Sequence, residues 1–161
     1  MKLIKTLSLF IIFLLLYFLP IFLFKADTSF YNTISKPQYA SPSWLFKMIW
    51  PILYAIFSFY LAYHLIYKAL AKELILYFLL NYIISFFFIK VFFIDKDFFL
   101  SFAVAFCSFI SGLFILITTF KDSKRDFLYF LPYVLWTLYA SILMANIYLI
   151  QQNCSYILCI A

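Results

Sequence analysis

Charged residues are scarce in this sequence of 161 amino acids, since Asp, Glu, Lys and Arg together make up 11% of it. Soluble domains carry roughly 25% charged residues. At this length a soluble fold could not bury the 68% of residues that are hydrophobic. The shortage of charge therefore excludes a soluble globular domain and predicts that many apolar side chains face lipid.

Glycine, histidine and cysteine are also rare, with one, one and three copies. The sequence shows no phosphate-binding loop, no pairing of a nucleophile with a base and no metal-ligand cluster. The only histidine, His64, lies near the end of an apolar run, where an interfacial residue is the ordinary interpretation and a haem ligand the alternative. Cys107 falls inside an apolar run, whereas Cys154 and Cys159 lie in a short tail as free thiols or a disulfide. We therefore assign no catalytic residue, no metal and no required cofactor.

Long apolar runs are what the chain has in abundance. Five of them, separated by charged residues, are near the ~20 residues that cross a bilayer core; they cover residues 7–24, 44–67, 74–94, 98–120 and 127–150. A β-barrel would need alternating strands of ~10 residues, and no alternation is visible. The first run is too long for a signal peptide and no small-residue cleavage site follows it. We expect an all-α integral membrane protein whose residues 1–161 form one five-transmembrane-helix bundle.

The net charge of +6 comes from Lys and Arg at the ends of these runs, which indicates lipid headgroups and topology rather than nucleic acid. Seven of these cations fall on one side of the predicted bundle: Lys2, Lys5, Lys68, Lys72, Lys121, Lys124 and Arg125. Five fall on the other side: Lys25, Lys36, Lys47, Lys90 and Lys96. The richer side is expected to be cytoplasmic. The N-terminus would then lie inside, and the long first loop and the C-terminus outside.

Two stretches about 80 residues apart resemble the motifs of one membrane-protein family. Residues 30–37 read FYNTISKP, and residues 36–54 read KPQYASPSWLFKMIWPILY. They are similar to W-Y-x-x-L-x-K-P, and to K-P-x-W-x-P-P-x-W-x-F followed by W-x-x-L-Y, of the translocator protein (tryptophan-rich sensory protein, TspO/MBR) family. Residues 132–140 read PYVLWTLYA and resemble P-Y-L-L-W-x-x-F-A. Asn81 falls where that family has an asparagine in its third span, so the resemblance covers nearly the whole chain in order.

The resemblance implies a five-helix bundle whose pocket is closed by a lid loop, residues 25–43, and which binds tetrapyrroles, sterols or aromatic drug-like molecules. The expected ligand-binding residues are Tyr31, Pro42, Trp50, Tyr54, Asn81, Ser85, Phe88, Trp136, Tyr139, Ala140 and Leu143. Some family positions differ: Tyr39 replaces the loop tryptophan, Ile84 a third-span tryptophan and Met144 a fifth-span asparagine. No basic residue follows Tyr148, so the proposed sterol motif is absent.

The spacing of large and small residues indicates a slot. Trp50 and Tyr54 share a helical face, as do Trp136 and Ala140. A small residue beside a large aromatic leaves room for a planar ring if the two faces meet, as the resemblance implies. Ordinary bundle packing is the alternative interpretation of both faces.

Two groups of small or polar residues lie inside the predicted spans, and each group has two possible packing partners. Asn81 and Ser85 should face inward because an amide in hydrocarbon needs a partner, which is either a neighbouring helix or a ligand. A seam of small residues on the fourth span packs inside the bundle or between protomers. That seam consists of Ser101, Ala105, Ser108 and Gly112.

From these observations we expect a tetrapyrrole-binding membrane protein that transports, buffers or senses porphyrins. A light-dependent porphyrin-degrading enzyme and a membrane scaffold with an incidental pocket are the alternatives. The expected partners are a tetrapyrrole or another hydrophobic small molecule, membrane lipid and a second copy in a homodimer, without nucleic acid. The expected location is the cytoplasmic membrane of a bacterium.

Overall fold

The computed structural model describes residues 1–25 and 27–160, with side chains through residue 153. This part of the chain contains helices and connectors and no strand, and five of its helices are long and apolar enough to cross a membrane. The prediction of an all-α, multi-pass membrane protein with five spans is therefore confirmed. The side chains of Cys154 and Cys159, for which a disulfide was one alternative, lie outside the described residues.

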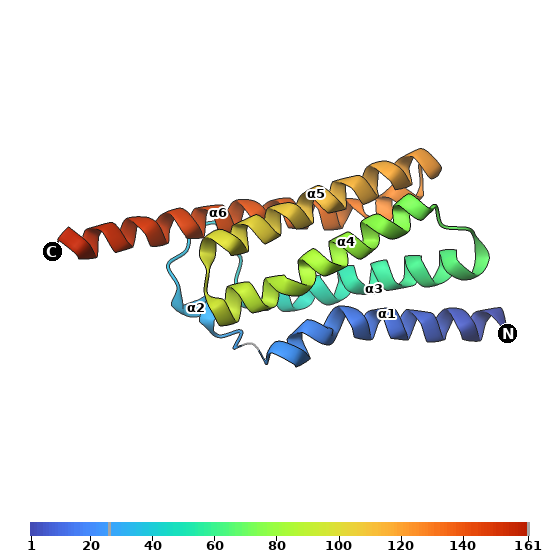
Figure 1. Ribbon diagram of the computed structural model, residues 1–161, viewed down its shortest axis with the longest axis horizontal. Coiled ribbons are helices and arrows are strands. Elements are labelled where there is room, and N and C mark those ends of the chain that lie inside the picture. The colour runs from blue at the N-terminus through green and yellow to red at the C-terminus, as the bar shows by residue number, and fades with distance from the viewer. Residues whose placement is uncertain (26, 161) are drawn as a thin grey trace.

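The long helices are α1 (Lys2–Phe24), α3 (Ser43–Tyr67), α4 (Lys72–Ile89), α5 (Phe98–Asp122) and α6 (Leu131–Ile160). Three short elements join them. Helix α2 (Phe30–Thr33) lies in the first loop, the π-helical turn η1 (Lys90–Asp95) continues α4, and the 3-10 turn η2 (Asp126–Tyr129) precedes α6. Figure 1 shows the two termini at opposite ends of the bundle, as an odd number of crossings requires.

Helices that follow one another in the sequence mostly lie side by side in the bundle. Helix α5 lies along α4 and α6, and α1 lies along α3 (Figure 1). Only 11% of the apolar window of α1 is buried, against 44% for α6, so α6 is central and α1 peripheral. Within the described residues, the backbone of α3 lies mainly against α1, with a smaller approach to η2. Side chains must therefore fill the space between α3 and the α5–α6 pair.

Aromatic rings fill this space in the half of the bundle near the N-terminus. Phe57 of α3 is 1% exposed, and its ring centroid lies 4.6 Å from that of Tyr133, 5.1 Å from Phe130 and 5.5 Å from Phe78. These are the tilted and edge-on arrangements that aromatic rings prefer. The cluster connects α3 to α4 and α6 through its side chains.

The small residues of α5 let this cluster form. Ser101, Ala105, Ser108 and Gly112 are all buried within the single chain, so the seam packs inside the bundle. At Gly112 a Cβ atom would lie 2.8 Å from Cε1 of Tyr133. Any larger residue would require that ring to shift, so the glycine lets Tyr133 pack closely against α5.

The proline inside α1 exposes a backbone acceptor that α4 uses. Pro20 has no N–H, so the carbonyl oxygen of Leu16 loses its helical donor. The hydroxyl of Tyr82 donates to that oxygen at 3.1 Å. The bond fastens the peripheral helix α1 to α4 at mid-span.

The end of α4 widens into the π-helical turn η1. In a π turn the hydrogen bonds join residues five apart, which brings Lys90 over Asp95. The Lys90 Nζ atom donates to both carboxylate oxygens, at 2.8 and 2.6 Å. The extra residue per turn shifts Phe92 and Phe93 relative to an α-helical continuation, and both then line the cavity described below.

Helix α6 begins four residues later than the predicted span. The apolar run starts at residue 127, but residues 127–129 belong to η2 and the helix starts at Leu131. Pro132 explains the start, because its fixed φ and missing N–H suit the first turn of a helix. Phe130, between the two elements, is 0% exposed in the aromatic cluster.

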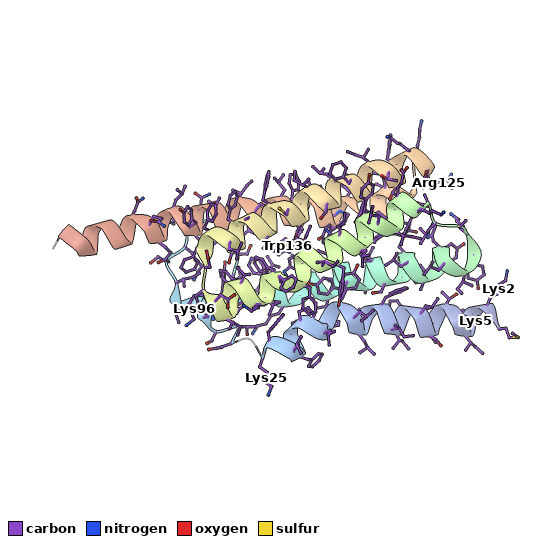
Figure 2. The ribbon with its side chains drawn as sticks, viewed as in Figure 1. Lys2, Lys5, Lys25, Lys96, Arg125 and Trp136 are labelled. Carbon is purple, nitrogen blue, oxygen red and sulfur yellow. The ribbon has the colours of Figure 1, made fainter. Side chains whose placement is uncertain are left out.

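The cations gather at the two ends of the bundle (Figure 2). Lys2, Lys5 and Arg125 lie at one end, and Lys25 and Lys96 at the other. This is the division that the sequence predicts between the two membrane surfaces.

Candidate functional site

A cavity of about 350 Å³ occupies the half of the bundle near the first loop. All five long helices, the first loop and η1 contribute to its wall. The lining residues are Phe18, Ile21, Thr28, Tyr31, Ser43, Phe46, Lys47, Trp50, Pro51, Tyr54, Ser85, Phe88, Ile89, Phe92, Phe93, Ala105, Ser108, Thr137, Ala140 and Met144. We call this space the lid-side cavity.

Flat rings make up two sides of the lid-side cavity. On α3, the Trp50 and Tyr54 rings lie 5.5 Å apart with a tilt of 31°. On α4 and η1, Phe88 and Phe92 stack at 5.7 Å and 10°. Such faces bind planar apolar molecules through burial and offset stacking.

The α6 side supplies the small residue that the slot needs. Ala140 lies on the cavity wall, and Thr137 and Met144, one turn away on either side along α6, lie on it as well. The Thr137 hydroxyl donates to the carbonyl oxygen of Tyr133 at 2.9 Å, so it offers the cavity mainly its methyl group. Of the two faces considered in the sequence, Trp50 and Tyr54 of α3 and Ala140 of α6 line this cavity.

The face that α6 presents is rotated from the predicted one. Trp136 does not line the cavity; its ring packs against Phe46 at 5.1 Å and Tyr139 at 5.3 Å, inside the bundle (Figure 2). Leu143 is 0% exposed in a core cluster with Tyr31. The α6 part of the wall therefore consists of Thr137, Ala140 and Met144, which are spaced three and four residues apart. The Trp136 ring is instead packed against Phe46 of α3.

Asn81 is satisfied by protein partners. Its Nδ2 group donates to Ser111 Oγ at 2.7 Å and to the Ser108 carbonyl oxygen at 3.2 Å, and its Oδ1 accepts from the Tyr133 hydroxyl at 2.9 Å. The side chain is 1% exposed and does not line the cavity. These contacts favour the first of the two alternatives, in which Asn81 joins helices.

Ser85 lies where this polar cluster meets the cavity. Its Oγ is 3.4 Å from Ser108 Oγ and 3.4 Å from the Tyr133 hydroxyl, and both serines are on the cavity wall. Ser85 is thus a polar group that a ligand can reach without breaking the Asn81 contacts. The other wall residues of α4 and η1 are apolar, so Ser85 and Ser108 are the polar groups on this side of the cavity.

The first loop is anchored at Ser41. The Tyr31 hydroxyl donates to the Ser41 carbonyl oxygen at 2.9 Å, and the Tyr139 hydroxyl accepts from the Ser41 N–H at 2.8 Å. Burial, with a smaller contribution from Tyr139, raises the pKa of Tyr31 to about 12, so its phenol stays a neutral donor. The Lys36 Nζ atom donates to the carbonyl oxygens of Tyr31 and Ile34, at 2.6 and 3.0 Å. These bonds hold the loop across the end of the bundle.

The residues of this loop that line the cavity differ from those that hold the loop in place. Thr28 and Tyr31 of the predicted lid loop, residues 25–43, line the cavity, whereas residues 36–42 of the same loop do not. Pro42 is the residue before α3, with extended backbone and an exposed side chain, and Tyr139 holds the loop from α6.

Of the predicted ligand-binding residues, six line the cavity: Tyr31, Trp50, Tyr54, Ser85, Phe88 and Ala140. Five do not: Pro42, Asn81, Trp136, Tyr139 and Leu143.

Several wall residues were not predicted from the sequence. Phe46 lies in the quoted loop motif and Met144 at a noted family difference, so a signal for both was present. Phe92 and Phe93 carried no signal because the π turn that directs them is invisible in a hydrophobic pattern. Phe18 could not be predicted as a wall residue either, because the sequence of α1 does not indicate which of its many apolar residues faces inward.

A second cavity, of about 380 Å³, lies at the opposite end of the bundle, where it is lined by His64, Lys68, Asp122 and Asp126 among others. The two imidazole nitrogens of His64 are both engaged: Nδ1 is 2.9 Å from the Tyr60 carbonyl oxygen and Nε2 is 3.3 Å from Asp126 Oδ2. His64 therefore joins α3 to η2 and is remote from the lid-side cavity. This geometry favours a structural residue over the haem-ligand alternative.

Similar proteins are known among bacterial membrane proteins. The chain matches the family model of the TspO/MBR family over residues 6–149. It is 29% identical to the tryptophan-rich protein TspO of Bacillus cereus over 139 residues, which cover 84% of this chain and 90% of that protein. It is 28% identical to the uncharacterized membrane protein YtaB of Bacillus subtilis over 150 residues, which cover 91% of this chain and 96% of that protein.

Proposed function

Since the chain belongs to the TspO/MBR family, we propose that it binds a tetrapyrrole or a similar flat hydrophobic molecule in the lid-side cavity. Binding would serve transport, buffering or sensing of porphyrins. The relatives named above are bacterial, which supports a bacterial cytoplasmic membrane as the location. The surplus of Lys and Arg at the N-terminal end supports a cytoplasmic N-terminus.

One observation carries the proposal: the Trp50–Tyr54 face and Ala140 line the same cavity. At about 350 Å³ this cavity lies within the roughly 300–1,000 Å³ range of small-molecule sites. Its aromatic sides suit a planar ring, and Ala140 leaves the width between them.

A titration tests the proposal. Protoporphyrin IX is added to the purified protein in a neutral detergent, and tryptophan fluorescence is followed against empty micelles carrying a free tryptophan analogue. We expect saturable quenching at one porphyrin per chain. Quenching that stays linear, as in the micelle control, would favour the scaffold with an incidental pocket.

The enzyme alternative has a separate test. Trp50 lines the cavity, and Trp136 packs against Phe46, which also lines it. Both tryptophans would therefore be near a bound porphyrin, and light-driven chemistry between them and the porphyrin can be measured. The saturated complex is illuminated and its absorption spectrum and products are compared with those of free porphyrin under the same light. Unchanged porphyrin would support binding without degradation, whereas faster loss than in the Trp50→Phe variant would indicate an enzyme.

A further inference from the structure

The wall of the lid-side cavity carries one ionised side chain. Among its lining residues Lys47 is the sole cation, and no Asp or Glu accompanies it. Lys47 lies near the start of α3, at the mouth of the cavity, where its side chain is exposed. A cation without a counter-charge beside an apolar slot attracts an anionic group of whatever occupies the slot.

The protein itself does not neutralise this charge. Within the described part of the chain, no ion pair, hydrogen bond or ring contact involves the Lys47 ammonium. Three other lysines at this end do have partners. Lys36 donates to loop carbonyl oxygens, Lys90 pairs with Asp95, and the Lys96 ammonium lies 4.8 Å above the Phe30 ring.

The backbone beside Lys47 adds to the positive potential. Ser43, the first residue of α3, also lines the cavity, and no side chain caps this end of the helix. The N–H groups of a first helical turn carry partial positive charge. Both contributions have the same sign and lie at the mouth, away from the aromatic sides formed by Trp50 and Tyr54.

We infer that Lys47 orients the ligand: its ammonium holds an anionic group, such as a porphyrin carboxylate, at the mouth of the cavity while the flat apolar body enters the slot. This inference rests on the proposed function and specifies which residue sets the orientation of the ligand. Anionic lipid headgroups share the chemistry of a carboxylate at such a position, so the test must separate the two sources.

The experiment compares two probes that share one ring system and differ in whether their carboxyl groups are free or methylated. Protoporphyrin IX has two carboxylates, and its dimethyl ester has the same ring and none. Affinities of both are measured in neutral detergent at low ionic strength for the parent, Lys47→Gln and Lys47→Arg. Lys25→Gln is the matched control, because Lys25 lies at the same end of the bundle and does not line the cavity (Figure 2).

We expect Lys47→Gln to weaken binding of the diacid about two- to fivefold, the size of an ion pair at an exposed site, and to leave ester binding unchanged. Lys47→Arg should restore the diacid affinity, added salt should remove the difference, and Lys25→Gln should behave like the parent. The comparison is a double-mutant cycle in protein and ligand, so a general loss of packing cancels from it.

Other outcomes overturn the inference in distinguishable ways. Equal losses for acid and ester, no loss for either, or the same loss in Lys25→Gln would show that Lys47 does not recognise the carboxylate, while the proposed function would stand. If the parent binds neither probe, the proposed function fails and the inference falls with it. If the acid shows no dependence on Lys47 but the variant loses affinity for phosphatidylglycerol in nanodiscs, Lys47 serves a lipid headgroup.

Discussion

Filling the slot from the α6 side should abolish most porphyrin binding without unfolding the protein. Ala140 is 6% exposed and lines the lid-side cavity, whose volume is about 350 Å³. In Ala140→Phe the added phenyl ring takes the volume of roughly three water molecules, on the order of 100 Å³. The substitution would therefore occupy a substantial part of the space between Ala140 and the Trp50–Tyr54 face.

The expected loss follows from the contacts that the new ring would displace. Stacking contributes about 0.5–1.5 kcal/mol per aromatic pair beyond apolar burial, and the ligand would lose its access to both Trp50 and Tyr54. Affinity should fall about tenfold or more, which corresponds to ~1.4 kcal/mol. Because the ring enters existing space, the overpacking cost of about 1–3 kcal/mol seen in well-filled cores should not apply.

The assay is tryptophan quenching by protoporphyrin IX, with thermal unfolding measured on the same samples. Ala145→Phe is the control, since it makes the same change on α6 at a partly exposed position that does not line the cavity. The reasoning is refuted if Ala140→Phe keeps the melting temperature and the porphyrin affinity of the parent. It is also refuted if Ala145→Phe loses as much affinity as Ala140→Phe.

Four further predictions concern the parts that hold the cavity in place. Gly112→Ala should lower the melting temperature, because its Cβ would meet the Tyr133 ring at 2.8 Å; an unchanged melting curve would contradict the close packing. Asn81→Leu should cost about 1–3 kcal/mol of unfolding free energy through unsatisfied buried partners, measured by denaturation in mixed micelles; lost affinity with full stability would instead make Asn81 a ligand contact. Tyr139→Phe should raise the porphyrin off-rate in stopped flow, because the loop loses its 2.8 Å anchor at Ser41 and its preorganisation; an unaltered off-rate would count against a loop that retains ligand. Reporters fused after the C-terminus and in the connector between α3 and α4 should fall on opposite sides of the membrane, and same-side signals would reject five crossings.

The number and type of the helices could be predicted because they depend on local composition. Each apolar run is long enough to span a bilayer, and backbone hydrogen bonds in lipid can be satisfied only within a helix or a closed barrel. Boundaries were less certain where two local signals compete. At residue 127 hydrophobicity argues for helix, but Pro132 moves the start to Leu131.

The side of each helix that faces the cavity was harder to predict. The α3 wall was found because Trp50 and Tyr54 stand in a recognisable motif and share a face. On α6 the same argument selected Trp136 and Leu143, but lipid-facing and inward-facing residues are equally apolar here, so the pattern does not fix the rotation of the helix. Rotation by one residue brings Thr137 to the wall.

The fate of polar groups depends on partners that only the fold brings together. Asn81 was recognised as inward-facing, but its donors end on Ser108 and Ser111 of another helix, 27 and 30 residues away in sequence. The position of Phe92 depends in turn on the π turn. Neither feature follows from the spacing of residues within one helix. The contacts of Asn81 and the position of Phe92 therefore could not be predicted from the sequence.

The location of a bound porphyrin tests the central claim most directly. A crystal structure of the protein with protoporphyrin IX, grown in a lipidic mesophase, would place the ring relative to the helices. The account predicts a ring between the Trp50–Tyr54 face and Ala140, beneath Tyr31 of the loop, with its carboxylates toward Lys47. A ring on the lipid-facing surface, with the lid-side cavity unchanged and without ligand, would contradict it.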